Sequence, residues 1–205
     1  MYNTGFTFGR AVWLLVVAVF AATSAFAVET LKGRVVKVAD GDTITVLDAA
    51  NMQHRIRLDK IDAPEKSQPF GGASRKHLAA LVAGKIVEVE WTKKDKYGRI
   101  LGTIWALLPA RTDVNLQMVE DGFAWHYRHF DSTPSYAAAE TAARRTKRGL
   151  WKAPAPIPPW TFRKARKRLH TNRNLTMTRR AIRLTTYNAN GSSAGSATRT
   201  GWYEK

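Results

Sequence analysis

The chain has 205 residues, with 33 Lys and Arg against 16 Asp and Glu, and a net charge of +17 that favours a polyanionic partner, either nucleic acid or an acidic membrane surface. It contains no cysteine, which excludes thiol catalysis, Cys-ligated zinc and iron–sulfur clusters. With 44% hydrophobic residues, 8 Pro and 14 Gly, it is neither collagen-like nor wholly disordered, and its length suits one ordinary domain with extensions or at most two small domains.

The first 27 residues have the pattern of a secretory signal peptide. Arg10 precedes an apolar run, residues 11–22, and the segment closes on Ala25-Phe26-Ala27, which is a small-x-small cleavage site. We expect cleavage after Ala27 and export to the periplasm or the medium. The alternative is a retained membrane anchor with the rest of the protein facing outward, because residues 11–27 approach the shortest length that spans a bilayer.

From residue 28 to residue 152 the pattern predicts one domain, mainly β in an α+β class. Alternating apolar residues predict five strands, and helical spacing predicts one helix after the third strand and two after the fifth. This order favours a closed five-stranded OB-type barrel with about three helices. The expected strands are 33–39, 43–47, 54–61, 85–91 and 99–107, and the expected helices are 74–82, 114–119 and 135–148.

The remaining residues, 153–205, differ in composition. Residues 153–159 (APAPIPP) predict a stiff, extended boundary, and eleven basic residues against Glu204 alone give this region a net charge of +10. We expect a mostly disordered basic tail with one helical turn within 161–169. Its possible roles are nonspecific contact with phosphates and contact with an anionic surface. Most of the net positive charge therefore lies outside the predicted domain, residues 28–152.

Two predicted turns carry carboxylates. Asp40 and Asp42 flank Gly41 between the first two strands, and Asp62 and Glu65 follow the third. If both turns lie at one rim of the barrel, the carboxylates repel each other and their pKa values rise unless a cation joins them. Oxygen ligands without His or Cys favour Ca²⁺ or Mg²⁺ over Zn²⁺. The plainer interpretation is that Asp-Gly simply forms a turn, as it commonly does.

Two arginines favour the chemical interpretation. Arg57 lies on the strand that leads into the second acidic turn, and Arg99 begins the last predicted strand. A cation and two guanidinium groups neutralise a phosphate as charge builds on its oxygens, and a carboxylate orients the attacking water. This set of groups suits hydrolysis of a phosphodiester.

These residues belong to two longer motifs. One is Asp40-Gly41-Asp42-Thr43-Ile44-x-Val46 followed, after ten residues, by Arg57-Leu58-x-x-Ile61-Asp62-x-Pro64-Glu65, and the other is Asp95-Lys96-Tyr97-Gly98-Arg99-x-Leu101-Gly102-x-Ile104-Trp105. Both resemble the signatures of the staphylococcal nuclease (thermonuclease) family, over roughly residues 31–152. The resemblance implies an OB-type barrel and a Ca²⁺-dependent nuclease for DNA and RNA, acting through in-line water attack that leaves 3′-phosphate ends.

The resemblance also implies a role for individual residues. Asp42, Asp62 and the backbone carbonyl of Ala63 would bind Ca²⁺, Asp40 would position a water bound to the ion, and Glu65 would be the general base. The other implied roles are phosphate clamps for Arg57 and Arg99, contacts to a neighbouring phosphate for Lys96 and Tyr97, and base stacking for Tyr127, with Trp125 or Phe130 as alternatives.

We expect a monomeric hydrolase with nucleic acid as its substrate and no protein partner. The main alternative is a non-catalytic nucleic-acid-binding OB module of the cell envelope, and a weaker one is an envelope structural or polysaccharide-associated protein. The residues implied in the chemistry are all present, which favours the enzyme.

Overall fold

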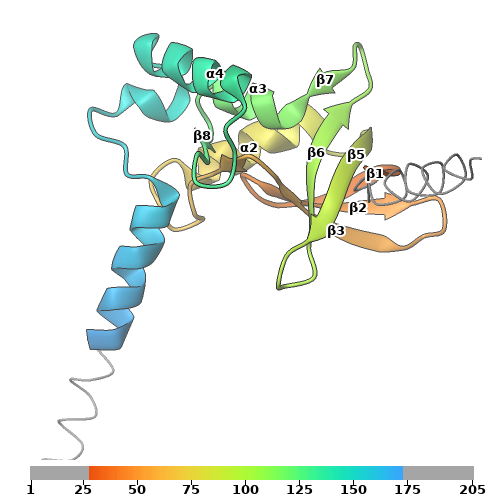
Figure 1. The fold of residues 1–205 in the computed structure, drawn as a ribbon, viewed down its shortest axis with the longest axis horizontal. Helices are drawn as coiled ribbons and strands as arrows, with labels where there is room; N and C mark the ends of the chain where they lie inside the picture. Colours follow the sequence, from red (N-terminus) through yellow and green to blue (C-terminus); the bar gives the residue numbers. More distant parts are fainter. Residues whose placement is uncertain (1–27, 173–205) are drawn as a thin grey trace, which may run out of the picture.

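The computed structural model describes residues 28–172, so the predicted signal segment and residues 173–205 lie outside the described part. Five strands form a closed barrel: β1 (Glu29–Asp40), β2 (Thr43–Asp48), β3 (Gln53–Leu58), β5 (Ile86–Lys94) and β6 (Ile100–Ala106) (Figure 1). They are antiparallel in the order β3-β2-β1-β5-β6, and a parallel pairing of β3 with β6 completes the ring. The predicted OB-type barrel is confirmed.

The long strand β1 shapes this barrel because it pairs with β2 on one side and β5 on the other. Two irregularities in its register with β2, between Val35 and Lys37 and between Val38 and Asp40, bend the strand as β-bulges do. A Cβ at Gly33 would overlap the backbone of Leu47, so this crowded position requires glycine.

Helices cover one side of the barrel. They are α2 (Gly71–Val82), α3 (Val114–Glu120) and α4 (Pro134–Arg145), followed by the short 3₁₀ helix η1 (Gly149–Lys152). Three two-residue strands complete the domain: β4 (Ile61–Asp62) pairs with β8 (Trp125–His126), and β7 (Thr112–Asp113) extends the sheet beside β6. The β4–β8 pair ties Asp62 to the segment that carries Tyr127.

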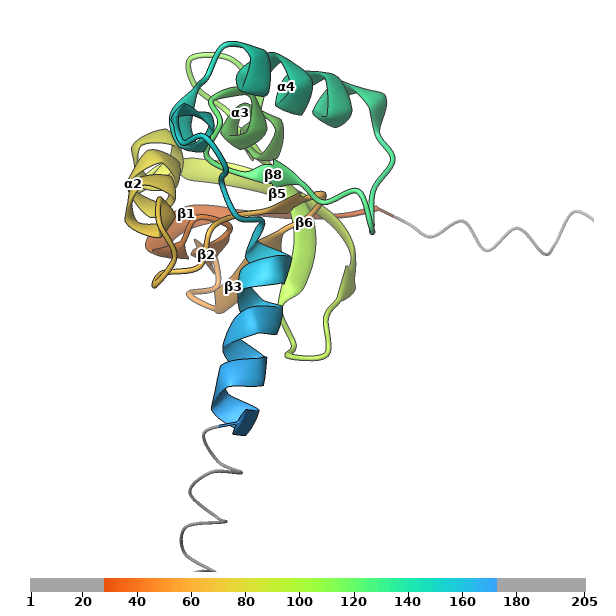
Figure 2. The same cartoon turned by 90° about the vertical axis from the view of Figure 1, so that its left-hand side faces the viewer.

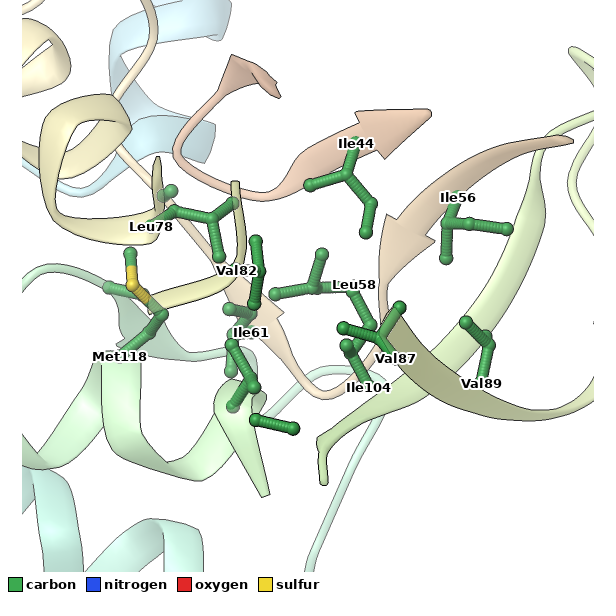
Figure 3. Close-up of a cluster of buried hydrophobic side chains, with 14 of the residues drawn as sticks. Ile44, Ile56, Leu58, Ile61, Leu78, Val82, Val87, Val89, Ile104 and Met118 are labelled. Carbon is green, nitrogen blue, oxygen red and sulfur yellow. The ribbon is translucent and has the colours of Figure 1, made fainter. Parts of the chain in front are cut away.

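The core fills the barrel and the space beneath α2 and α3. Fully buried aliphatic residues from the strands, among them Leu58 and Ile104, meet Leu78 of α2 and Met118 of α3 (Figure 3). Each such side chain contributes roughly 1.5–3 kcal/mol by leaving water. This packing fixes the start of β2 and the end of β3, which adjoin the two acidic turns.

The largest difference from the sequence prediction lies after residue 158. A helix spans residues 159–172, much longer than the single turn expected within 161–169, and it begins against the barrel and then runs away from it (Figures 1 and 2). Arg, Lys, Ala and Leu are good helix formers, and Pro159 at the start is compatible with a first helical turn. Composition alone therefore overestimated disorder here.

No helix within residues 28–172 is long and apolar enough to cross a membrane.

Candidate active site

The turn between β1 and β2 presents Asp42 toward the second acidic turn. The carboxylate of Asp42 is buried, and it accepts hydrogen bonds from the backbone N–H of Ala63 at 2.9 Å and from the Thr43 hydroxyl at 3.1 Å. A Cβ on Gly41 would overlap the hydroxyl oxygen of Ser74 in α2. The absence of a side chain at Gly41 thus lets the turn press against this helix.

Arg57 joins the two acidic turns. Its Nη2 lies 3.1 Å from Oδ2 of Asp42 and 2.9 Å from Oδ1 of Asp62, and its Nη1 donates to the carbonyls of Leu58 and Ile61 at 2.7 and 3.0 Å. Four contacts fix the orientation of this guanidinium. The expectation that the two turns meet at one rim of the barrel agrees with this geometry.

Buried negative charge accumulates here. Burial raises the pKa of Asp62, against the opposing effect of hydrogen bonds and charge from Arg163 and Arg57. Burial, together with the charge of Asp42, raises the pKa of Asp40 to about 6. A further positive charge at this rim would stabilise the ionised carboxylates.

The structure supplies such a charge from an unexpected place. Arg163, in the helix 159–172, donates to Oδ1 and Oδ2 of Asp62 at 3.1 and 2.7 Å, and to Oε1 of Glu65 at 2.8 Å. The pair with Asp62 is bidentate, which is the favoured geometry between a guanidinium and a carboxylate. Arg163 belongs to the basic run seen in the sequence, but no sequence pattern indicates a partner about a hundred positions away.

The donor set suits a hard cation. Within residues 28–172 no group of three or more His, Asp or Glu residues has the arrangement of a metal site. The carboxylates of Asp42 and Asp62 nevertheless share one guanidinium, and Asp62 and Glu65 hold a second, so the cluster already attracts cationic groups. All of these ligand atoms are oxygens, which Ca²⁺ and Mg²⁺ prefer.

Three predicted site residues form a separate group on the turn between β5 and β6. Arg99 is held by Asp95, whose Oδ2 accepts from its Nε at 2.7 Å, while Oδ1 accepts from its backbone N–H at 3.0 Å. Tyr97 is 71% exposed, and the Lys96 ammonium lies 5.1 Å from the centre of its ring.

Within residues 28–172 no hydrogen bond or ion pair links this turn to Asp42, Asp62 or Glu65. Leu101 of β6 pairs with Arg57 of β3, and Arg99 lies two residues before Leu101 in the chain.

The predicted stacking residue already has a partner. Tyr127 stacks on Trp160 with ring centres 5.4 Å apart and ring planes 8° apart, and Phe130 packs edge-on against it at 4.8 Å. Tyr127 and Trp160 line a cavity of about 630 Å³ together with Arg128 and Arg144. Trp125 is 2% exposed and packs on Trp151, so it is unsuited to the stacking role left open for it.

Sequence reasoning missed three residues around this site: Gln68, Trp160 and Arg163. The side-chain amide of Gln68 donates to the carbonyl of Ile157, and its Oε1 accepts from the N–H of Glu65 at 3.2 Å. Gln68 therefore couples the loop of Glu65 to the segment that leads into the helix 159–172. These contacts depend on the folded path of the chain, which no local motif records.

Known proteins provide an independent comparison. The family model described as staphylococcal nuclease homologue matches residues 55–153. A protein of Escherichia coli named uncharacterized endonuclease is 47% identical over 133 residues, covering 65% of this chain and 85% of the relative. The chain belongs to the staphylococcal nuclease homologue family.

Other relatives of the family agree with this assignment. A micrococcal nuclease of Shigella flexneri is 42% identical over 146 residues, covering 66% of this chain and 82% of its own. An uncharacterized endonuclease of Haemophilus influenzae is 40% identical over 149 residues, covering 73% and 82% of the two chains. The helix 159–172 lies beyond the segment that the family model matches.

Proposed function

We propose that this protein is a Ca²⁺-dependent nuclease that hydrolyses phosphodiesters of DNA and RNA. The observation that carries the proposal is the arrangement of Arg57, which bridges Asp42 and Asp62 beside Glu65 in a member of a nuclease family. The names of the relatives, endonuclease and micrococcal nuclease, support the same activity.

In this proposal Asp42, Asp62 and the carbonyl of Ala63 hold the ion, and Asp40 positions a water bound to it. The fit of Ca²⁺ rests on the all-oxygen donor set and on the burial that raises the pKa of Asp62. When bound, a divalent cation supplies positive charge to the oxygens of the scissile phosphate.

The reaction itself needs a base and two phosphate clamps. Glu65 takes a proton from a water molecule as the water oxygen attacks phosphorus, and its 29% exposed side chain leaves room for that water. The P–O5′ bond breaks in line, the 5′-oxygen takes a proton from solvent water, and a 3′-phosphate remains. Arg57 and Arg99 stabilise the charge that develops on the phosphate oxygens.

The remaining residues orient the polynucleotide. Lys96 and Tyr97 lie exposed on the turn that carries Arg99, where they suit a neighbouring phosphate. Tyr127 provides an aromatic face for a base. We also propose export of the enzyme, on the strength of the signal pattern in residues 1–27.

The alternative is an OB module that binds nucleic acid without cutting it. End-labelled DNA and RNA, incubated with the purified chain and Ca²⁺, separate the two functions. The enzyme yields shorter products with 3′-phosphate ends, which a phosphatase removes. Retarded but intact nucleic acid would establish the binding module and overturn the nuclease.

A further inference from the structure

A basic groove lies beside the acidic rim, which is the group of carboxylates formed by Asp40, Asp42, Asp62 and Glu65. Four cationic side chains line a cavity of about 750 Å³: Lys37 of β1, Arg55 of β3, Lys66 of the loop after Glu65, and Arg75 of α2. The lining contains no acidic residue. In the described part of the chain, none of the four forms an ion pair or a hydrogen bond through its side chain.

The groove extends from the acidic rim along one face of the sheet. Lys37 pairs with Thr45, which pairs with Arg55, and the next row of the same face contains Thr43, paired with Asp40 and Arg57. Two residues along a strand correspond to about 6.6 Å. Because Lys66 directly follows Glu65, the groove also borders the proposed base.

We propose that this groove binds the phosphate backbone of a polynucleotide on one side of the scissile bond. Four like charges in a lining that contains no acidic residue repel each other, and a polyanion lying in the groove relieves that repulsion. The groove lies one strand row away from Arg57, so it holds flanking nucleotides rather than the reacting phosphate. The inference rests on the proposed nuclease function and adds a preference for longer substrates.

The test uses the full chain carrying Glu65→Gln, which keeps the substrate intact. Binding of a decanucleotide and of a dinucleotide is measured over a range of salt concentrations, with and without Arg55→Gln plus Arg75→Gln. We expect the neutralised variant to lose about tenfold in the ratio of decanucleotide to dinucleotide affinity. Its salt slope should fall by about 1.4, at 0.7 for each phosphate contact to a single strand. Arg145→Gln, an exposed change on α4, is the control.

An unchanged ratio and slope would overturn the groove as a subsite, and so would an equal loss in the Arg145→Gln control. Failure of both oligonucleotides to bind the unneutralised chain would instead overturn the nuclease function on which the groove depends. Stronger binding to anionic vesicles than to the decanucleotide, lost in the neutralised variant, would assign the groove to a membrane surface and also overturn the proposal.

A second, independent observation concerns the helix 159–172. Arg163 covers both carboxylate oxygens of Asp62 and reaches Glu65, while Trp160, one turn earlier, covers the face of Tyr127. A cationic group thus stands at the proposed cation ligand, and an aromatic ring stands at the proposed base-stacking position. We infer that this helix is an autoinhibitory element that competes with Ca²⁺ and with a nucleobase.

The helix is attached in a way that permits release. Its first two turns and the preceding segment make the contacts, through Trp160, Arg163 and the carbonyl of Ile157, while the rest of the helix extends away from the barrel (Figures 1 and 2). The Arg163 side chain is 38% exposed, so solvent reaches the cationic partner of this pair, whereas the Asp62 side chain is 1% exposed. Ca²⁺ and a polyanion together would displace the helix.

Calorimetric titration of Ca²⁺ into the full chain tests this competition without relying on cleavage. We expect Arg163→Gln to bind Ca²⁺ at least fivefold more tightly than the unmodified chain. Arg166→Gln, which removes the same charge from the next turn of the helix, should stay within twofold. Trp160→Leu, which leaves the carboxylates untouched, should tighten Ca²⁺ binding in the same direction by loosening the helix.

Unchanged or weaker Ca²⁺ binding in both Arg163→Gln and Trp160→Leu would overturn autoinhibition, as would equal effects of Arg163→Gln and Arg166→Gln. Near-ultraviolet circular dichroism of each variant verifies its tertiary structure. Tighter Ca²⁺ binding without any cleavage of DNA would support competition at the cation site while overturning the nuclease function.

Discussion

Gly41 and Ser74 are in such close contact that a methyl group on Gly41 would overlap the Ser74 hydroxyl oxygen. Ser74 is itself fixed, because its hydroxyl donates to the carbonyl of Phe123 at 2.7 Å. The acidic turn is therefore positioned by α2 as well as by its own strands. The geometry of Asp40 and Asp42 depends on this contact.

We predict that Gly41→Ala lowers the free energy of unfolding by about 1–3 kcal/mol, because an extra carbon must be accommodated in a packed interface. It should also weaken Ca²⁺ binding by displacing Asp42. Urea unfolding and calorimetry measure the two effects. Gly72→Ala is the control for stability, since a Cβ there meets no atom within 4 Å. Equal stability of the two variants would contradict the positioning role of α2.

We predict that Glu65→Gln reduces kcat by at least 100-fold, because the amide cannot accept the proton of the attacking water. The fold should persist, since Glu65 lies on a loop and its carboxylate contacts Arg163 rather than the core. Steady-state cleavage and the thermal unfolding midpoint provide the measurements. Turnover close to that of the unmodified enzyme would remove Glu65 from the base role.

Asp95 holds Arg99 in place through its side chain and backbone. We predict that Asp95→Asn lowers kcat/KM about tenfold, because the charge that orients the Arg99 guanidinium is lost. Ca²⁺ affinity should not change, since Asp95 lies on a different turn from the acidic rim. Asp121→Asn, which removes the ion-pair partner of His77 in α2, is the matched control. Loss of Ca²⁺ affinity in Asp95→Asn would contradict this separation of roles.

The carboxylate of Asp131 orders the segment after Tyr127. Burial tends to raise its pKa, but hydrogen bonds from Thr133 and His126 outweigh burial and lower the pKa below its usual 3.8. A lowered carboxyl pKa stabilises the fold at pH values above the pKa that the same carboxyl has in the unfolded chain. This stability is lost as the pH falls through the pKa of the carboxyl in the fold.

We therefore predict that Asp131→Asn is less stable than the unmodified chain by about 1–2 kcal/mol at pH 7, through loss of charge-assisted hydrogen bonds. The difference should shrink as the pH falls from about 4, the pKa of an aspartate in the unfolded chain, through the lowered pKa of Asp131 in the fold. Urea unfolding at pH 7 and at pH 3 measures it. A difference of the same size at both values would contradict the assignment.

The barrel could be predicted because its strands show alternating apolar residues that end at recognisable turns. The meeting of Asp42, Arg57 and Asp62 was predictable from motifs, since each residue ends or adjoins a strand in a fixed topology. The contact between Arg163 and Asp62 was not, because it joins residues 101 positions apart through a helix of which the composition indicated only one turn in an otherwise disordered tail. The pairing of Arg99 with Asp95 was also missed. The motif indicates that Arg99 lies near the phosphate of the substrate, but it does not indicate which residue holds Arg99 when no phosphate is bound.

The central claim is that the acidic rim cleaves phosphodiesters with a bound divalent cation. The most direct test is cleavage of plasmid DNA by the purified chain with Ca²⁺, then with excess chelator, and then with Ca²⁺ restored. We predict cleavage with Ca²⁺, arrest with the chelator and recovery on restoration, with no cleavage by Glu65→Gln under any condition. DNA that stays intact with Ca²⁺, or cleavage that continues in the chelator, would contradict the claim.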